Sequence, residues 1–186
     1  MNPVAERSTP RYINLKVTRE EYLDLPEDGF KYDMIGGILH LSPSPSFEHA
    51  ERANQLNVRI ANFLLNNPIA KIVMECDVLL PDGGDVVRPD ITVIRNENMG
   101  IVKTHIHGVP DLVVEVLSPA TRLRDLGEKS DRYLQNGIPE YWIVDPEAHR
   151  IEVRYNRKTE WESASGEQLK SEILPGLVVD QKEVFQ

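Results

Sequence analysis

The run Leu112-Val-Val-Glu-Val-Leu117 constrains the fold of this chain more than any other segment. It is apolar at every position except Glu115, so the strand that it forms would be apolar on both of its faces. Ser118-Pro119 ends the run. This pattern is typical of a central strand in a sheet that is covered on both sides. Glu115 is the position that departs from it.

The segments around this run predict several helices and strands. Capping residues and apolar spacing predict a short helix after Thr18 and longer ones at Phe47–Asn66, behind Ser46, and at Asp125–Gln135. The predicted strands are Tyr32–Ile35 and Ile38–Leu41, joined as a hairpin by Gly36-Gly37, then Ile69–Leu80, Val86–Ile94, Glu140–Val144, Ile151–Tyr155, Thr159–Glu162 and Leu177–Val179. Strands mixed with helices in this way predict an α/β or mixed α+β fold.

The 186 residues contain no stretch with the composition of a linker or a repeat. We therefore expect one domain over residues 1–186, with residues 1–12 as a loose N-terminal arm. Met1–Pro10 lacks the apolar core of a secretory signal, and no apolar run is long enough to cross a membrane. Cys76 is the only cysteine, which excludes an internal disulfide. These features together predict a cytoplasmic protein without membrane contact.

The net charge is −9, from 30 acidic and 21 basic residues. A strong negative field repels phosphates, so the balance argues against a protein that coats DNA or membranes without specificity. It is compatible with a metal site made of carboxylates. The charge is also uneven, because residues 118–132 hold four basic and three acidic side chains, and residues 149–160 hold four and two.

Three side chains depart from what their local sequence leads one to expect. Glu115 is costly in a buried strand unless it is paired or binds a cation; alternatively it faces solvent or pairs with an arginine. Asp90, in Arg88-Pro-Asp90, precedes an apolar strand, where it could simply begin a turn. Lys129 has helical spacing to Leu126 and Tyr133, although a lysine there could cover apolar surface with its stem and keep its ammonium group in water.

Together these residues suggest a phosphate chemistry. Two acidic residues that each enter a strand of one sheet could converge on Mg²⁺, which takes one or two carboxylates, waters and a substrate oxygen. A nearby lysine could orient or deprotonate the attacking water and offset phosphate charge.

The order of these motifs resembles the Uma-type family of restriction endonucleases, within the PD-(D/E)XK nuclease superfamily. The resemblance extends from about Val17 to Phe185. The motifs that carry it are Arg88-Pro-Asp90, Pro110-Asp-Leu-Val-Val-Glu-Val-Leu-Ser-Pro119, Asp125-Leu-Gly-Glu-Lys129, Tyr133 and Gly137-Ile-Pro-Glu-Tyr-Trp-Ile-Val-Asp-Pro146.

The resemblance implies a restriction-endonuclease-like core with flanking helices and an N-terminal hairpin. It also implies that Asp90 is the aspartate of the PD motif and Glu115 the acidic residue of the (D/E)XK motif. Leu117 stands where the superfamily has its lysine, and Lys129 is the family's match for that lysine. By the same analogy the carbonyl group of Val116 is a further metal ligand.

Two more positions follow from the resemblance. His49 matches a family histidine and is a candidate catalytic residue; the alternative is a hydrogen-bonded histidine on a half-buried face. Asp33 stands where relatives have glutamate, and its shorter side chain reaches less far.

The resemblance therefore implies an Mg²⁺-dependent endonuclease that hydrolyses DNA phosphodiester bonds, with Mn²⁺ able to substitute. The alternative is a catalytically silent nuclease fold that binds DNA or protein. Cutting both strands takes two active sites, so a homodimer is expected from the mechanism.

No GxxxxGK[ST] or GxGxxG motif is present, so we expect no nucleotide cofactor. The candidate phosphate contacts, each alternatively a solvated surface charge, are Arg122, Arg124, Arg132, Arg150, Arg154, Arg157 and Lys158.

Overall fold

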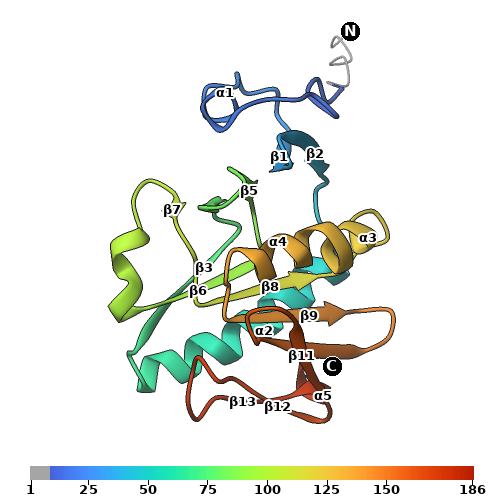
Figure 1. Ribbon diagram of the computed structural model, residues 1–186. Helices are drawn as coiled ribbons and strands as arrows, with labels where there is room; N and C mark the ends of the chain where they lie inside the picture. Colours follow the sequence, from blue (N-terminus) through green and yellow to red (C-terminus); the bar gives the residue numbers. More distant parts are fainter. Residues whose placement is uncertain (1–8) are drawn as a thin grey trace, which may run out of the picture.

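The computed structural model describes residues 9–186 (Figure 1). Residues 1–8, the larger part of the expected N-terminal arm, lie outside the described residues. Of the remaining arm, the Arg11 backbone N–H donates to Asp28, and Tyr12 packs edge-on against Tyr32. Within the described part, the chain forms a six-stranded sheet, a five-stranded sheet and a two-stranded ribbon. The α/β fold expected from the sequence is confirmed.

The six-stranded sheet holds the apolar run near its centre. Its strands, in spatial order, are β11 (Trp161–Ser165), β10 (Arg150–Asn156), β9 (Glu140–Asp145), β8 (Leu112–Val116), β6 (Ile91–Arg95) and β3 (Ala70–Met74). β8 pairs in parallel with β9 and antiparallel with β6. It therefore has a hydrogen-bonded neighbour on each side, as a run that is apolar on both faces requires.

Helix α2 (Phe47–Asn66) covers one face of this sheet. Its buried side chains are Ala53, Leu56, Ile60 and Leu64, and they share a core with Leu112, Val114 and Val116 of β8. Burying one leucine or isoleucine side chain contributes about 1.5–3 kcal/mol. The Ser46 hydroxyl caps the start of α2 by accepting a hydrogen bond from the backbone N–H of His49.

The opposite face of the sheet is covered by a second helical segment. It runs without interruption through α3 (Arg122–Arg124), a π-helical turn η2 (Asp125–Lys129) and α4 (Ser130–Gln135). The sequence predicted Asp125–Gln135 as one helix, so the helix begins earlier than expected and contains a wider turn. Gly137, at φ 79°, ends it, with N–H groups of residues 137 and 138 bonded back into the last turn.

The five-stranded sheet packs beside these elements. Its strands, in spatial order, are β2 (Ile38–Ser42), β1 (Lys31–Ile35), β5 (Val86–Val87), β4 (Val78–Leu79) and β7 (Ile106–His107). β1 and β2 form the predicted hairpin, whose turn residues Gly36 and Gly37 have φ of 60° and 74°. Helix α1 (Arg19–Leu23), capped by Thr18, precedes the hairpin as expected.

Two predicted strands are each divided in the structure. The segment predicted as Ile69–Leu80 is β3 followed by β4, and the segment predicted as Val86–Ile94 is β5 followed by β6. Glu75, at φ 49°, bends the first segment, and Pro89, which has no N–H for a ladder, interrupts the second. Both segments therefore pass from one sheet to the other, and both crossing points lie on the wall of a pocket.

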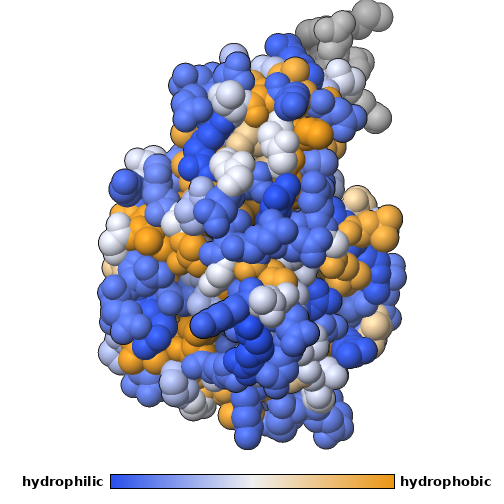
Figure 2. Space-filling model, viewed as in Figure 1, coloured by the Kyte–Doolittle hydropathy of each residue, from blue (hydrophilic) through white to orange (hydrophobic). Residues whose placement is uncertain are grey.

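The C-terminal part closes the face that holds α2. The ribbon of β12 (Gln168–Lys170) and β13 (Val178–Asp180) leads into α5 (Gln181–Val184), which contacts α2. A short 3₁₀ helix, η1 (Asn96–Ile101), follows β6. On the face shown in Figure 2, apolar side chains gather in small separate groups within a hydrophilic surface. Among residues 9–186, no helix has the length and apolar character needed to span a membrane.

Candidate active site

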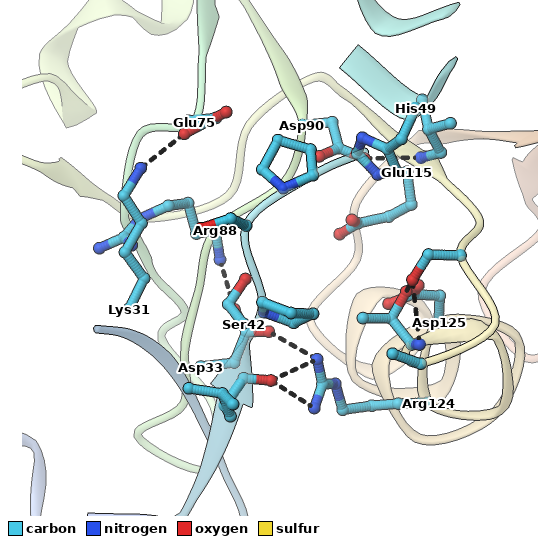
Figure 3. Close-up of a pocket in the computed structure, with 18 of the residues that line it drawn as sticks. Lys31, Asp33, Ser42, His49, Glu75, Arg88, Asp90, Glu115, Arg124 and Asp125 are labelled. Carbon is cyan, nitrogen blue, oxygen red and sulfur yellow. Dashed lines mark hydrogen bonds and ion pairs between the residues drawn. The ribbon is translucent and has the colours of Figure 1, made fainter. Parts of the chain in front are cut away.

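A pocket of about 570 Å³ opens where the two sheets meet. The hairpin strands, the loop Ser42–Ser46 and the start of α2 form one side of it, and the ends of β8 and the α3–η2 helix form the other. The pocket brings together Asp33, His49, Asp90, Glu115, Val116 and Lys129. Figure 3 shows Asp90, His49 and Glu115 near one another, with Asp33 and Arg124 across the pocket from them.

Glu115 lies on the face of β8 that points toward α4. Alternation along the strand places it with Val113 and Leu117, and only 4% of it is exposed, so it does not face solvent. Its Oε1 atom lies 2.7 Å from Lys129 Nζ and accepts a 2.5 Å hydrogen bond from the Tyr133 hydroxyl. Burial raises the pKa of Glu115 well above its ordinary value; Asp125 and Asp90 add to the rise, and Lys129 opposes it.

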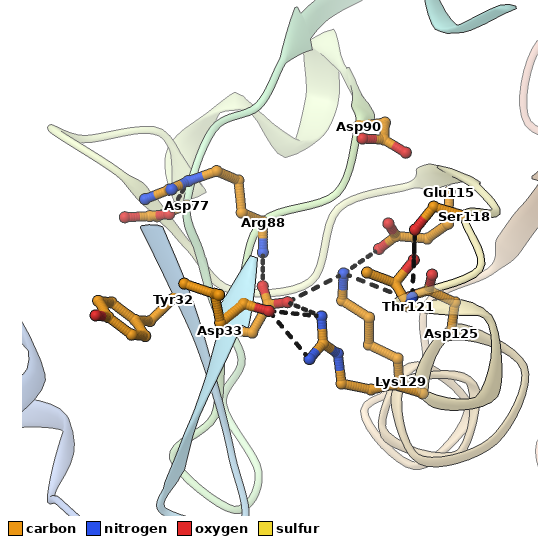
Figure 4. A network of polar contacts seen from close by, with 12 residues as sticks. Tyr32, Asp33, Asp77, Arg88, Asp90, Glu115, Ser118, Thr121, Asp125 and Lys129 are labelled. Carbon is orange, nitrogen blue, oxygen red and sulfur yellow. Dashed lines mark hydrogen bonds and ion pairs between the residues drawn. The ribbon is translucent and has the colours of Figure 1, made fainter. Parts of the chain in front are cut away.

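The ammonium group of Lys129 lies at the wall of the pocket and is enclosed there by carboxylates. Only 3% of Lys129 is exposed, and its Nζ lies 3.6 Å from Asp33 Oδ2 and 3.8 Å from Asp125 Oδ1, besides its contact with Glu115 (Figure 4). Burial alone would lower the pKa of Lys129, but the three carboxylates raise it above its ordinary value. The charged form of this lysine is therefore the stable one.

Asp33 holds the opposite side of the ammonium group. It is buried on β1, where its Oδ1 accepts the Arg88 backbone N–H at 2.9 Å and its Oδ2 lies 3.5 Å from Arg124 Nη2. Asp33 therefore connects the hairpin to Lys129 and to the segment that leads into Asp90.

Asp90 lies at the start of β6, beside the end of β8. Its Oδ2 accepts the backbone N–H of Val116 at 2.6 Å and lies 3.3 Å from His49 Nε2. Burial by itself would lower the pKa of His49. Contact with Asp90 outweighs this effect, so the pKa of His49 lies above its ordinary value. The structure thus places Asp90, Val116 and His49 in one cluster.

The donor set in this cluster fits a hard, oxygen-preferring cation. Among residues 9–186 no group of three or more His, Cys, Asp or Glu side chains is arranged to hold a metal ion, so a cation here would also need backbone or water ligands. Within the same residues no hydrogen bond reaches Glu115 Oε2, and Glu115 lines the pocket. Asp90 and Asp125 also repel the charge of Glu115, which a cation would offset. Two carboxylates and a carbonyl group, completed by water, suit Mg²⁺.

Most of the candidate phosphate-binding side chains already contact protein groups. Arg124 lies in the pocket, and Arg150 donates to the Ser165 hydroxyl. The remaining arginine pairs are Arg122 with Asp145, Arg132 with Asp85, Arg154 with Glu152, and Arg157 with Glu162 and Glu172. Contact with phosphate would require these arginines to exchange a partner, and it stays a prediction.

Three residues that shape this site are not among the catalytic or metal-binding residues that the sequence predicts, although Asp33 is noted there as standing where relatives have glutamate. Asp125 and Tyr133 stand four residues before and after Lys129, which is the spacing of neighbours on one helical face and could have indicated contact. The third, Asp33, reaches Lys129 only because the hairpin packs against the helix, and no local pattern indicates that contact.

A solved structure has the same fold. The crystal structure of "a putative nuclease belonging to DUF820" from Anabaena variabilis superposes with a TM-score of 0.77 and 20% sequence identity, covering 91% of this chain and 97% of that chain. A search among curated proteins gave no match. The model of the Uma2 family, described as "Putative restriction endonuclease", matches residues 19–182. Because this match spans nearly all of the sequence, the chain belongs to the Uma2 family.

Proposed function

We propose that this protein is an Mg²⁺-dependent endonuclease that hydrolyses phosphodiester bonds of DNA. The observation that carries the proposal is Glu115, a buried carboxylate at the pocket near Asp90 (Figure 3). Lys129 and Tyr133 hold its Oε1, and within residues 9–186 its Oε2 receives no hydrogen bond. The description of the family and that of the structural relative both support a nuclease.

Asp90, Glu115 and the Val116 carbonyl group would hold the cation, and Mn²⁺ would substitute for Mg²⁺. A bound cation would supply Lewis-acid stabilisation of the charge on the phosphate. The Val116 N–H and His49 keep Asp90 in place for this task.

Lys129 would act as a positioned positive charge. Three carboxylates lie within 4 Å of its ammonium group, at 2.7, 3.6 and 3.8 Å, and fix it next to Glu115. From there it would orient water and phosphate and offset charge on the phosphate oxygens. This assignment favours orientation of the attacking water over its deprotonation.

The net charge supports a second candidate, a nuclease fold that binds DNA or protein without cutting. The chain carries −9, and most of its candidate phosphate-binding arginines are paired with carboxylates. Against it, Asp90, Glu115 and Lys129 are all present and lie in one pocket.

Conversion of supercoiled plasmid by the purified full-length protein tests the proposal. We expect open-circular or linear DNA with Mg²⁺ or Mn²⁺ and no conversion with EDTA. Glu115→Gln should lose activity on the order of 10²-fold or more, because a weakened metal site loses several kcal/mol of stabilisation of the charge on the phosphate. Glu160→Gln is the matched control, because it changes an exposed glutamate that does not line the pocket.

Intact plasmid with either cation, together with no divalent binding by calorimetry, would overturn the endonuclease. The silent module is favoured if the protein binds DNA without cutting and Glu115→Gln removes cation binding while DNA affinity stays unchanged.

A further inference from the structure

Tyr133 lies directly against Glu115 in the core below the pocket. It has no exposed surface, and its hydroxyl donates to Glu115 Oε1 at 2.5 Å. Its ring packs edge-on against Tyr141, with centroids 5.1 Å apart and an interplanar angle of 77°. The ring therefore has little freedom to move, and the direction of its hydroxyl is fixed.

The two oxygens of Glu115 have different surroundings as a result. Oε1 accepts a hydrogen bond from the Tyr133 hydroxyl and lies 2.7 Å from the Lys129 ammonium group, so two positively polarised groups face this oxygen. Among residues 9–186 nothing hydrogen-bonds to Oε2. Tyr133 and Lys129 also approach from separate turns of one helical segment, so together they fix the plane of the carboxylate.

We infer that Tyr133 is a positioning residue that leaves Glu115 a single oxygen for the cation and thereby favours Mg²⁺ over Ca²⁺. The inference rests on the proposed function. Mg²⁺ is small, keeps several waters and binds a carboxylate through one oxygen, whereas Ca²⁺ has a larger shell that readily takes both oxygens of one carboxylate. The Tyr133 hydroxyl proton and the Lys129 ammonium group both face Oε1 and repel a cation from it, so that second contact is disfavoured.

The pair Tyr133→Phe and Tyr141→Phe separates this role from simple packing. Both tyrosines are fully buried on the same face of the sheet, and the Tyr141 hydroxyl donates to the Asp125 carbonyl group at 3.0 Å, not to Glu115. Each change removes one buried hydroxyl and keeps the ring, so both lower the melting temperature measured without metal.

Isothermal titration calorimetry of the full-length protein with Mg²⁺ and, separately, Ca²⁺ gives the readout. We expect Tyr133→Phe to weaken Mg²⁺ binding by about 10-fold, the lower end of the range for losing a partner of a metal ligand. Ca²⁺ binding should weaken less, so the Mg²⁺/Ca²⁺ affinity ratio falls. Tyr141→Phe should keep the wild-type ratio.

The outcomes distinguish the inference from the proposed function. If the wild-type protein binds neither Mg²⁺ nor Mn²⁺ and cuts no DNA, the proposed function fails. If the wild type binds Mg²⁺ and Tyr133→Phe keeps the wild-type affinity ratio, the inference about Tyr133 fails and the proposed function stands. Wild-type protein that binds Ca²⁺ more tightly than Mg²⁺ also overturns the inference, and that measurement needs no variant to fold.

Discussion

Lys129 Nζ, from a helical turn, lies 2.7 Å from Oε1 of Glu115, which comes from the central strand. Leu117 follows Glu115 on the same face of the chain and packs into the apolar core, so it provides no charge there. The π-helical turn of η2 holds the lysine over the strand instead. An ammonium group can therefore reach this carboxylate without any lysine on the strand.

Replacing Lys129 by methionine should abolish DNA cutting and lower stability. The change leaves Glu115, Asp33 and Asp125 buried without their shared cation, and breaking a buried pair costs about 3–5 kcal/mol. Plasmid conversion and urea denaturation measure the two effects.

Adding Leu117→Lys to Lys129→Met restores a lysine to the same face of β8, and we expect part of the activity to return. Full activity of Lys129→Met alone would contradict its role.

The sequence predicted those parts of the fold that depend on local patterns. α2 has the predicted bounds, because its apolar spacing and the Ser46 cap are local signals. β8 is central, as its run of apolar residues indicates. The prediction of one strand over Ile69–Leu80 was wrong, because the backbone turns at Glu75 and enters a second sheet. Apolar residues lie on both sides of Glu75, so the sequence pattern does not mark this turn.

In the candidate site, too, local sequence patterns predict some residues, and tertiary packing determines the others. Asp90, Glu115 and Lys129 stood out because each departs from its local pattern, and the structure places all three on the pocket. Asp33 and Tyr133 act only through tertiary packing. Asp33 reaches Lys129 from the hairpin, and Tyr133 looked like an ordinary core residue from its helical spacing.

Asp33→Asn should destabilise the protein while leaving the backbone contact of the hairpin in place. The amide oxygen can still accept the Arg88 N–H, but the negative charge beside Lys129 and Arg124 is lost. We expect a loss of about 3 kcal/mol in the free energy of unfolding, measured by urea denaturation. Asp24→Asn, at an exposed position of the same N-terminal region, is the control and should change stability by less than about 0.5 kcal/mol. Equal effects of the two changes would contradict the importance of Asp33.

Asp85 should make stability depend on pH. It is fully buried, and burial raises its pKa above the ordinary value, although the Gly36 N–H, Arg132 and Arg19 oppose the rise and Glu128 adds to it. A carboxyl group with a raised folded-state pKa binds its proton more tightly when folded. Its stabilising contribution is therefore complete below the unfolded-state pKa and is lost as the pH rises through the folded-state pKa.

Asp85→Asn removes this titration and keeps an oxygen that can accept the Gly36 N–H. Relative to the wild type, the melting temperature of the variant should rise as the pH is raised from about 4 to about 7. Asp82→Asn, in the adjacent turn and exposed, should show no such trend. A constant difference between Asp85→Asn and wild type across this range would contradict the raised pKa.

His49 should act on Asp90 and not on the phosphate. Its Nε2 lies 3.3 Å from Asp90 Oδ2, an oxygen that also accepts the Val116 N–H. His49→Ala removes one of these two contacts, so we expect the Mg²⁺ concentration for half-maximal cutting to rise about 10-fold, with the maximal rate reduced by a few-fold at most. Glu48→Ala, the exposed neighbour in the same turn of α2, should leave both quantities unchanged. Titration of plasmid cutting against Mg²⁺ separates this role from proton transfer by His49. If His49 transferred a proton in the reaction, His49→Ala would lower the maximal cutting rate by about 10²-fold or more and leave the Mg²⁺ dependence unchanged.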